Sequence, residues 1–115
     1  MVNIKDIRTI EEWEKIKSEA SRKNELIIFK YSPYCSISAN VEEDFNNWAK
    51  DLPVESEINC VKVNVISERP ISQLIAKDLG VVHQSPQVIW LDKNFNVKWN
   101  ASHYQITQKK LSSCL

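Results

Sequence analysis

Residues 26–38 read LIIFKYSPYCSIS, and this stretch predicts the centre of the fold. Its first four residues are apolar, branched or aromatic, which is typical of a strand covered on both faces. We expect this strand to be central in a parallel sheet. The polar turn after it contains Pro33 and brings Cys35 to the start of a predicted helix. Free backbone N–H groups and the helix dipole stabilise an anion there, so we predict a reactive thiol rather than an inert buried one.

Ser38 occupies the position where a dithiol redox protein carries its second cysteine, so this motif cannot close an internal disulfide. Its side chain is either an ordinary first-turn hydroxyl or a hydrogen-bond donor to the Cys35 sulfur. We predict that both residues are catalytic. Lys30 lies just upstream, where it either adds positive field to a thiolate or points its head into solvent.

The other two cysteines are poor resolving partners. Cys60 opens the next predicted strand at the opposite edge of the sheet, about 16 Å away for a five-residue strand. A disulfide requires a Cα separation below about 7 Å. Cys114 lies about 10 Å down the last predicted helix. We therefore interpret Cys60 as structural and Cys114 as a frayed terminal residue.

Hydrophobic spacing and turn residues predict the remaining elements. The expected order begins with a short edge strand at 3–5 and a helix over 10–21, which a capping box of Thr9 and Glu12 begins. The strand and turn at 26–38 are followed by a helix from 37 to 48, which ends before Pro53, and by a strand over 60–65. The remaining elements are a helix from Pro70 to Leu79 closed by Gly80, a hairpin of strands 87–91 and 96–99, and a last helix capped by Thr107 and carrying Leu111.

This order predicts a single α/β domain over 1–115, with a mixed sheet between helices and a C-terminal hairpin followed by a helix. Right-handed crossovers favour the first two helices on one side of the sheet and the later elements on the other.

Composition excludes several classes of function. Fifteen basic residues balance fifteen acidic ones, so no charge pattern indicates nucleic acid or a membrane surface. Neither a secretory signal nor a membrane-spanning apolar run is visible, and three widely spaced cysteines indicate reduced thiols. These features predict a cytoplasmic protein. No metal site is expected, because no Cys-x-x-Cys pair exists and His83 and His103 stand alone.

A second motif, Ser85-Pro86, precedes the third predicted apolar strand. A cis bond there would leave the backbone of Ser85 free to pair with an extended substrate, although most X-Pro bonds are trans.

The succession of elements resembles the thioredoxin fold over essentially the whole chain. Three segments, 35–40, 83–87 and 99–107, more narrowly resemble the YtxJ-type monothiol bacilliredoxin family, whose signature reads Thr-Cys-Pro-Ile-Ser. Members of that family are associated with the low-molecular-weight thiol bacillithiol. Tyr34 and Ser36 depart from the signature, standing where threonine and proline are usual, and the missing proline alters the start of the helix.

The resemblance implies roles for particular residues. Cys35 would be the redox nucleophile, Pro86 the cis-proline facing it, and Ser85 the residue that offers its backbone to substrate. The loop over 101–105 would help to hold the thiol, which places Ser102 and His103 with Tyr34 among the substrate-binding residues; the alternative for His103 is an ordinary surface histidine. Lys30 and Thr107 are the expected cofactor-binding residues, the latter through N–H groups at the start of the last helix.

The resemblance thus implies a monothiol thiol–disulfide oxidoreductase that removes bacillithiol from mixed disulfides on client proteins. Its partners would be S-thiolated clients and a second thiol or a reductase for recycling, with bacillithiol as co-substrate and no permanently bound cofactor. Two alternatives stay open: glutathione-dependent thiol exchange, and a thioredoxin-like peptide-binding module without turnover.

Overall fold

The computed structural model describes residues 4–18, 24–34 and 36–115. Within these ranges five strands form one sheet in the order β1-β3-β2-β4-β5. The elements in chain order are β1 (Ile4–Asp6), α1 (Ile10–Ser18), β2 (Glu25–Tyr31), α2 (Ser36–Lys50), a 3₁₀ turn η1 (Val54–Ser56), β3 (Ile58–Asn64), α3 (Arg69–Leu79), β4 (Gln87–Leu91), β5 (Val97–Ser102), η2 (His103–Gln105) and α4 (Gln108–Ser113).

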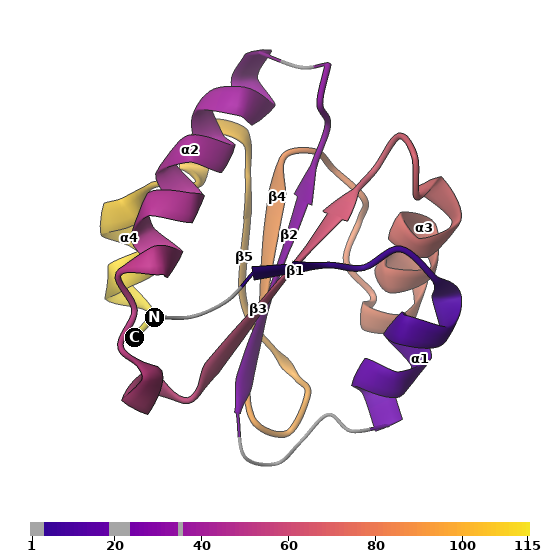
Figure 1. The fold of residues 1–115 in the computed structure, drawn as a ribbon, viewed down its shortest axis with the longest axis horizontal. Helices are drawn as coiled ribbons and strands as arrows, with labels where there is room; N and C mark the ends of the chain where they lie inside the picture. Colours follow the sequence, from indigo (N-terminus) through magenta and orange to yellow (C-terminus); the bar gives the residue numbers. More distant parts are fainter. Residues whose placement is uncertain (1–3, 19–23, 35) are drawn as a thin grey trace.

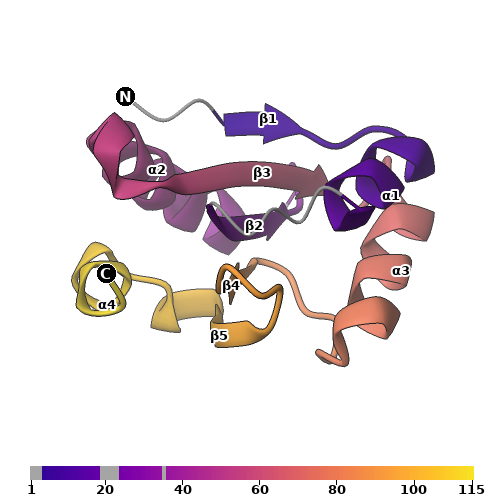
Figure 2. The ribbon, with the colours of Figure 1, turned by 90° about the horizontal axis from the view of Figure 1, so that it is seen from below.

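The sheet forms the middle of three layers, with helices on both faces (Figures 1 and 2). Helices α2 and α4 cover one face, whereas α1 and α3 cover the other. The expectation that the first two helices share a side is therefore wrong. From β1 the chain crosses over β3 to reach β2, and from β2 it returns to β3, so the two crossovers run in opposite directions across the sheet. Right-handed connections of opposite direction place their helices on opposite faces.

Strand β2 is central, as predicted, and it lies in a mixed sheet, as the order of elements predicts, rather than in a wholly parallel one. It pairs in parallel with β3 and antiparallel with β4, and β1 adds a parallel edge strand beyond β3. The hairpin of β4 and β5 supplies the antiparallel half. Five consecutive residues of β2 are buried because helices cover both faces of this strand. The predicted three-layer architecture with a terminal hairpin and helix is confirmed.

Local signals in the sequence begin or end three of the helices at the predicted residues. Thr9 and Glu12 form the capping box, with Glu12 N–H donating to Thr9 Oγ1 at 3.0 Å and Thr9 N–H donating to Glu12 Oε1 at 3.1 Å. Gly80 closes α3 with a φ of 66°, which an L side chain rarely adopts. Thr107 caps α4 by accepting from Lys110 N at 3.1 Å.

Some predicted bounds shift in the structure. Strand β3 begins at Ile58, two residues earlier than predicted, and β5 continues to Ser102. Residues 19–21 of the predicted first helix, and Asn3 of the predicted edge strand, lie outside the described residues. The extension of β5 matters most, because it carries the chain to the end of the sheet where the candidate site lies.

Each face of the sheet has its own apolar core. On the α2 and α4 face, Phe29 stacks on Phe45 with ring centroids 4.7 Å apart, and Trp48 meets Trp90 edge to face at 5.7 Å. On the opposite face, fully buried Trp13 and Ile75 join α1 to α3. Alternate residues of β2 contribute to the two cores, and this alternation decides which way each polar residue near the end of the strand points.

Candidate functional site

Four strands end or begin on the same side of the sheet, and we call this row of strand ends the Tyr31 edge. Strand β2 ends there at Tyr31, opposite Asn64 at the end of β3. Gln87 begins β4 beside Lys30 and pairs with Ser102 at the end of β5. The segments that follow or precede these ends, 32–34, 65–68, 80–86 and 103–107, therefore leave the sheet on the same side. This convergence brings the predicted site segments together.

The turn after β2 is held by the hydroxyl of Ser38. Its Oγ accepts a hydrogen bond from the backbone N–H of Ser32 at 2.9 Å, and its side chain is 0% exposed. Tyr34, in contrast, is 85% exposed. Cys35, the predicted nucleophile, lies outside the described residues, while its neighbour Ser36 begins α2. Ser38 thus acts as a structural tie across the turn, and its predicted catalytic role stays a prediction.

The segment before β4 contains the predicted cis bond. The Ser85–Pro86 peptide is cis, and Pro86 is buried. The Oγ of Ser85 is buried without a hydrogen-bond partner among the described residues. Buried Gln87 fixes the preceding backbone, because its Nε2 donates to Val82 O at 3.0 Å and its Oε1 accepts from Gln84 N at 3.4 Å. The Ser85–Pro86 peptide therefore lies in an anchored loop.

The segment after β5 is joined to the same loop. His103 donates its backbone N–H to Pro86 O at 3.0 Å, and its φ of 55° turns the chain into η2. Its side chain is exposed and that of Ser102 is partly buried. The Thr107 hydroxyl serves α4 as its N-cap. Ser102 and His103 thus lie beside Pro86, whereas a cofactor-binding role for Thr107 stays a prediction.

Lys30 points into the protein, so the alternative in which its head lies in solvent is wrong. It shares the α1 and α3 face with Leu26 and Ile28 and is 0% exposed. Its Nζ donates to Ser72 O at 2.9 Å and lies 3.3 Å from Nδ1 of His83. Burial lowers the pKa of Lys30 to about 8. Its contacts are thus with protein groups, and the predicted contact with a cofactor stays a prediction.

His83 and Ser72 were given no role by the sequence patterns. Ser72 Oγ lies 3.1 Å from His83 Nδ1, and Lys30 Nζ contacts both the Ser72 backbone oxygen and His83 Nδ1. Burial, followed by the positive charges of Lys30 and Arg69, lowers the pKa of His83. The sequence of the strand indicates the burial of Lys30: side chains alternate between the two faces of a sheet, so residue 30 shares a buried face with residues 26 and 28. A lysine at such a position needs internal partners.

The remaining two cysteines lie in or against the α2 and α4 core. Cys60 is 2% exposed and pairs with Ile27, well before the end of β2. Burial raises the pKa of Cys60 to about 12. Cys114, expected to be frayed, instead ends α4 as its C-cap and is partly buried. Cys60 therefore has the structural character that the sequence predicted.

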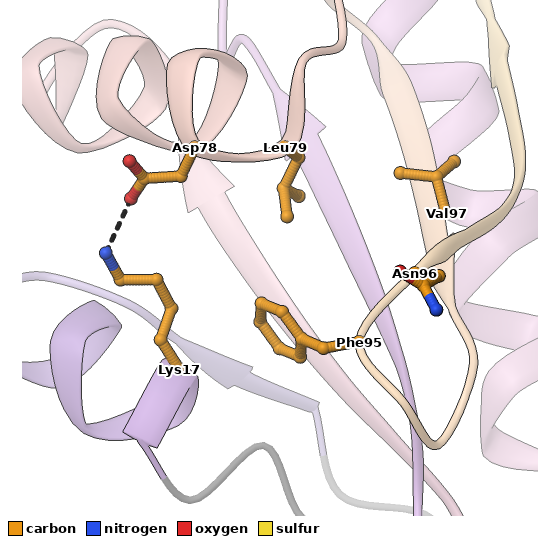
Figure 3. A pocket seen from close by; sticks show the side chains of 6 residues that line it. All are labelled: Lys17, Asp78, Leu79, Phe95, Asn96 and Val97. Atoms are coloured by element: carbon orange, nitrogen blue, oxygen red, sulfur yellow. Dashed lines mark hydrogen bonds and ion pairs between the residues drawn. The ribbon is translucent and has the colours of Figure 1, made fainter.

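Two hollows lie at opposite ends of the sheet. One, of about 350 Å³, opens at the Tyr31 edge and is lined by Asp6, Ile7, Arg8, Tyr31, Asn64, Ser67 and Glu68. The other, of about 280 Å³, lies near the hairpin turn, and its lining includes an ion pair between Lys17 and Asp78 (Figure 3). Within the described ranges no three potential metal-ligating side chains gather, and no helix there is long and apolar enough to cross a bilayer.

Comparison with a family model decides the relationship of this chain to known proteins. Residues 5–111 match the model described as "Monothiol bacilliredoxin BrxC". The chain belongs to the monothiol bacilliredoxin family. The match includes every segment at the Tyr31 edge, together with Cys35 and Ser38. Bacilliredoxin membership and the fold support a thiol–disulfide oxidoreductase.

Solved structures place the same chain among thioredoxin folds. A putative oxidoreductase with a thioredoxin fold is 26% identical, with a TM-score of 0.80 over 96% of this chain and 92% of that one. Thioredoxin from Malassezia sympodialis is 15% identical, with a TM-score of 0.72 over 98% and 88%. Thioredoxin from Fasciola hepatica is 17% identical, with a TM-score of 0.70 over 95% and 93%. The two thioredoxins support the fold alone.

Proposed function

We propose that this bacilliredoxin removes bacillithiol from mixed disulfides on client proteins, with Cys35 as its one nucleophile. The Cys35 thiolate attacks the bacillithiol sulfur of the mixed disulfide. A new disulfide forms between Cys35 and bacillithiol, the old S–S bond breaks, and the client leaves as a thiolate that takes up a proton. A second bacillithiol or a reductase then supplies the two electrons that release the adduct.

The observation that carries this proposal is the environment of Ser38. At the position of a resolving thiol, this chain has a hydroxyl that is fully buried and that holds the Ser32 N–H. Cys60 is buried beside Ile27, and burial raises its pKa to about 12, so at neutral pH it is a protonated thiol. A thiol is nucleophilic only as the thiolate. These features favour release of the adduct by an external thiol over internal disulfide formation.

The Tyr31 edge supports binding of both halves of a mixed disulfide. We place an extended client segment along the anchored loop at Ser85 and Pro86, where the buried Ser85 hydroxyl has no partner among the described residues. Ser102 and His103 flank this loop, and Tyr34 stands exposed in the turn before α2. We assign the client to the Ser85 backbone and the small thiol to the neighbouring segments. Thr107 completes the proposed cofactor-binding residues, with Lys30 contributing its buried charge rather than a direct contact.

Exposed apolar side chains at the same edge fit a protein client. Tyr34, Val82 and Tyr104 are 85%, 80% and 69% exposed and come from three of the converging segments. Apolar side chains at a rim supply contact area that a free small thiol does not need. A location in the cytoplasm, where proteins are kept reduced, suits a monothiol enzyme of this kind and is part of the proposal.

The test is transfer of labelled bacillithiol from a loaded client protein. The native chain, Cys35→Ser and Cys35→Ala are compared, with Cys114→Ser as the matched control that keeps the proposed nucleophile. We expect release of label by the native chain and the control only, together with a mass increase on the native chain equal to one bacillithiol. Transfer that survives both Cys35 substitutions would falsify the proposal.

Two further measurements separate the alternatives. A client loaded with glutathione instead of bacillithiol tests the choice of small thiol, and equal rates would favour broad thiol exchange. Alkylation of Cys35 tests the binding-module alternative. If the alkylated chain still removes the small thiol from the client at the native rate, Cys35 is not the nucleophile of an enzyme. If neither chain removes the small thiol but both bind the client equally well, the protein is a peptide-binding module that needs no thiol.

A further inference from the structure

A buried lysine without an acidic partner lies beneath the Tyr31 edge. Lys30 is fully buried, and its Nζ contacts Ser72 O and His83 Nδ1, both of them uncharged groups. None of the ion pairs formed by the described residues includes Lys30. A positive charge in such a place favours an anion nearby, because little solvent screens it.

The charge on Lys30 determines where His83 carries its hydrogen. An ammonium group only donates, so the nitrogen that faces it must accept. That nitrogen is Nδ1, 3.3 Å from Lys30 Nζ and 3.1 Å from Ser72 Oγ, which is free to donate to it. A hydrogen on Nδ1 would point toward the positive charge. The neutral ring therefore carries its hydrogen on Nε2.

The groups that face the ring keep it neutral. They are Lys30 from β2, and Ser72 and Arg69 from α3; the two charged ones are both cations. Burial and these cations lower the pKa of His83, so the ring stays unprotonated at neutral pH. The ammonium at Nδ1 also draws electron density from the ring, which makes the N–H on the far side a stronger donor.

The loop holds this donor at the candidate site. His83 is exposed although its Nδ1 faces inward, and it lies two residues before Ser85. Gln87 fixes the backbone on both sides of it through Val82 O and Gln84 N. Nε2 has no hydrogen-bond partner among the described residues. An anchored loop thus carries a polarised, unpaired N–H with a net positive charge behind it.

We propose that His83 donates its Nε2–H to a carboxylate on the small-thiol half of the mixed disulfide, and that Lys30 and Ser72 are positioning residues that set the tautomer. This inference rests on the proposed function and names the group on the small thiol that the site recognises. No covalent step is added to the exchange.

The first test measures the tautomer directly by ¹⁵N NMR of the imidazole nitrogens in the native chain. We expect His83 to carry hydrogen on Nε2 and to have a pKa lower than that of an ordinary histidine. The chain has two histidines, so the imidazole signals that remain in His103→Gln belong to His83. In Lys30→Met we expect a mixture of tautomers and a higher pKa for His83, an effect that a merely structural role for Lys30 would not produce.

The second test uses two probes that differ only in charge. A thiol-bearing peptide is loaded with N-acetylcysteine, which has a carboxylate, or with N-acetylcysteine amide, which does not. We expect the native chain to reduce the acid adduct about tenfold faster in kcat/KM, mostly through KM, as one charge-assisted hydrogen bond allows. In His83→Leu the preference should be lost, so that the acid and amide adducts react at equal rates.

The outcomes distinguish this inference from the proposed function. Equal rates for the two adducts in the native chain, or a preference that persists in His83→Leu, overturn the carboxylate contact. Hydrogen on Nδ1 of His83 overturns the role of Lys30 and Ser72, and this measurement needs no turnover. A native chain that reduces neither adduct counts against the proposed function instead.

Discussion

The backbone N–H of Ser32 donates to the side-chain oxygen of Ser38 at 2.9 Å, so a hydrogen bond spans the turn that contains Cys35. In a dithiol protein a disulfide between the first and fourth positions of the motif would span the same turn. Here the tie does not depend on redox state. The turn therefore keeps the same internal constraint whether Cys35 is reduced or carries a small thiol.

Replacing Ser38 with alanine should destabilise the fold. The buried oxygen is lost and the Ser32 N–H loses its partner, at a cost of about 1 kcal/mol. That cost lowers the Tm of a domain of this size by about 4 °C. Thermal unfolding followed by circular dichroism measures it. Ser36→Ala, an exposed change in the same turn, is the control, and an equal Tm for the two variants would contradict the proposed tie.

Lys30 should make stability rise with pH in the alkaline range. Its pKa falls from 10.5 in the unfolded chain to about 8 in the fold. Between these values the unfolded chain binds a proton that the fold releases, so the free energy of unfolding increases. The difference corresponds to about 3 kcal/mol gained by pH 10.5 relative to pH 7.

Urea unfolding of the native chain and Lys30→Met checks this from pH 7 to pH 10.5. Subtracting the two curves removes the other groups that titrate there. Lys93→Met serves as the control, since Lys93 is exposed and its ion pair with Glu57 raises its pKa. Parallel curves for the native chain and Lys30→Met would show that Lys30 is not a buried ammonium at neutral pH.

Cys60 should resist alkylation in the folded chain. Its thiol is 2% exposed, and burial raises its pKa to about 12, so almost none is thiolate at pH 8. In a Cys35→Ser variant treated with iodoacetamide, mass spectrometry should find one adduct, on partly exposed Cys114. In denaturing urea a second adduct should form, on Cys60. Rapid labelling of Cys60 without urea would refute its structural role.

Asp78 should be needed to hold α1 on α3. Its carboxylate accepts from the Nε1 of fully buried Trp13 at 2.9 Å and from Lys17 Nζ at 2.7 Å. Asp78→Leu leaves the Trp13 N–H unpaired and should cost about 1–3 kcal/mol in urea unfolding. Asp78→Asn keeps an acceptor oxygen and should cost less. If the two variants are equally stable, the Trp13 hydrogen bond contributes nothing.

The pH dependence of the same contact has a defined sign. Hydrogen bonds from Lys17 and then Trp13 lower the pKa of Asp78 below its usual 3.8. The carboxylate therefore stabilises the fold above that usual value, and the contribution is lost as the pH falls through the lowered pKa. Acid unfolding of the native chain against Asp78→Asn measures this loss, and coincident curves would contradict it.

Much of the fold was predictable because local chemistry decides it. The bounds of β4 follow from an apolar run between polar turns, and Gly80 and Thr107 end or begin helices through backbone geometry and hydrogen bonding. The faces taken by α1 and α2 were not predictable from periodicity. A hydrophobic stripe requires a helix to cover a sheet, but the order of strands decides which face it covers.

The candidate site was predictable in its motif and less so in its interior. Cys35, Ser85 and Pro86 are marked by residue type and by turn chemistry. The contact of Lys30 with His83 joins residues 53 positions apart and depends on the loop that Gln87 anchors. A pattern along the chain reports which face a residue occupies, but it does not report which distant polar group meets it there.

The hydrogen bond from His103 to Pro86 joins the segment after β5 to the loop before β4, so the Tyr31 edge is complete only late in synthesis. Cys35 leaves the ribosome well before the segment over 103–107, since residues 36–102 must be translated between them. At about 5–20 residues per second this takes several seconds. During that interval the nascent chain carries a thiol without the edge that would select its partners.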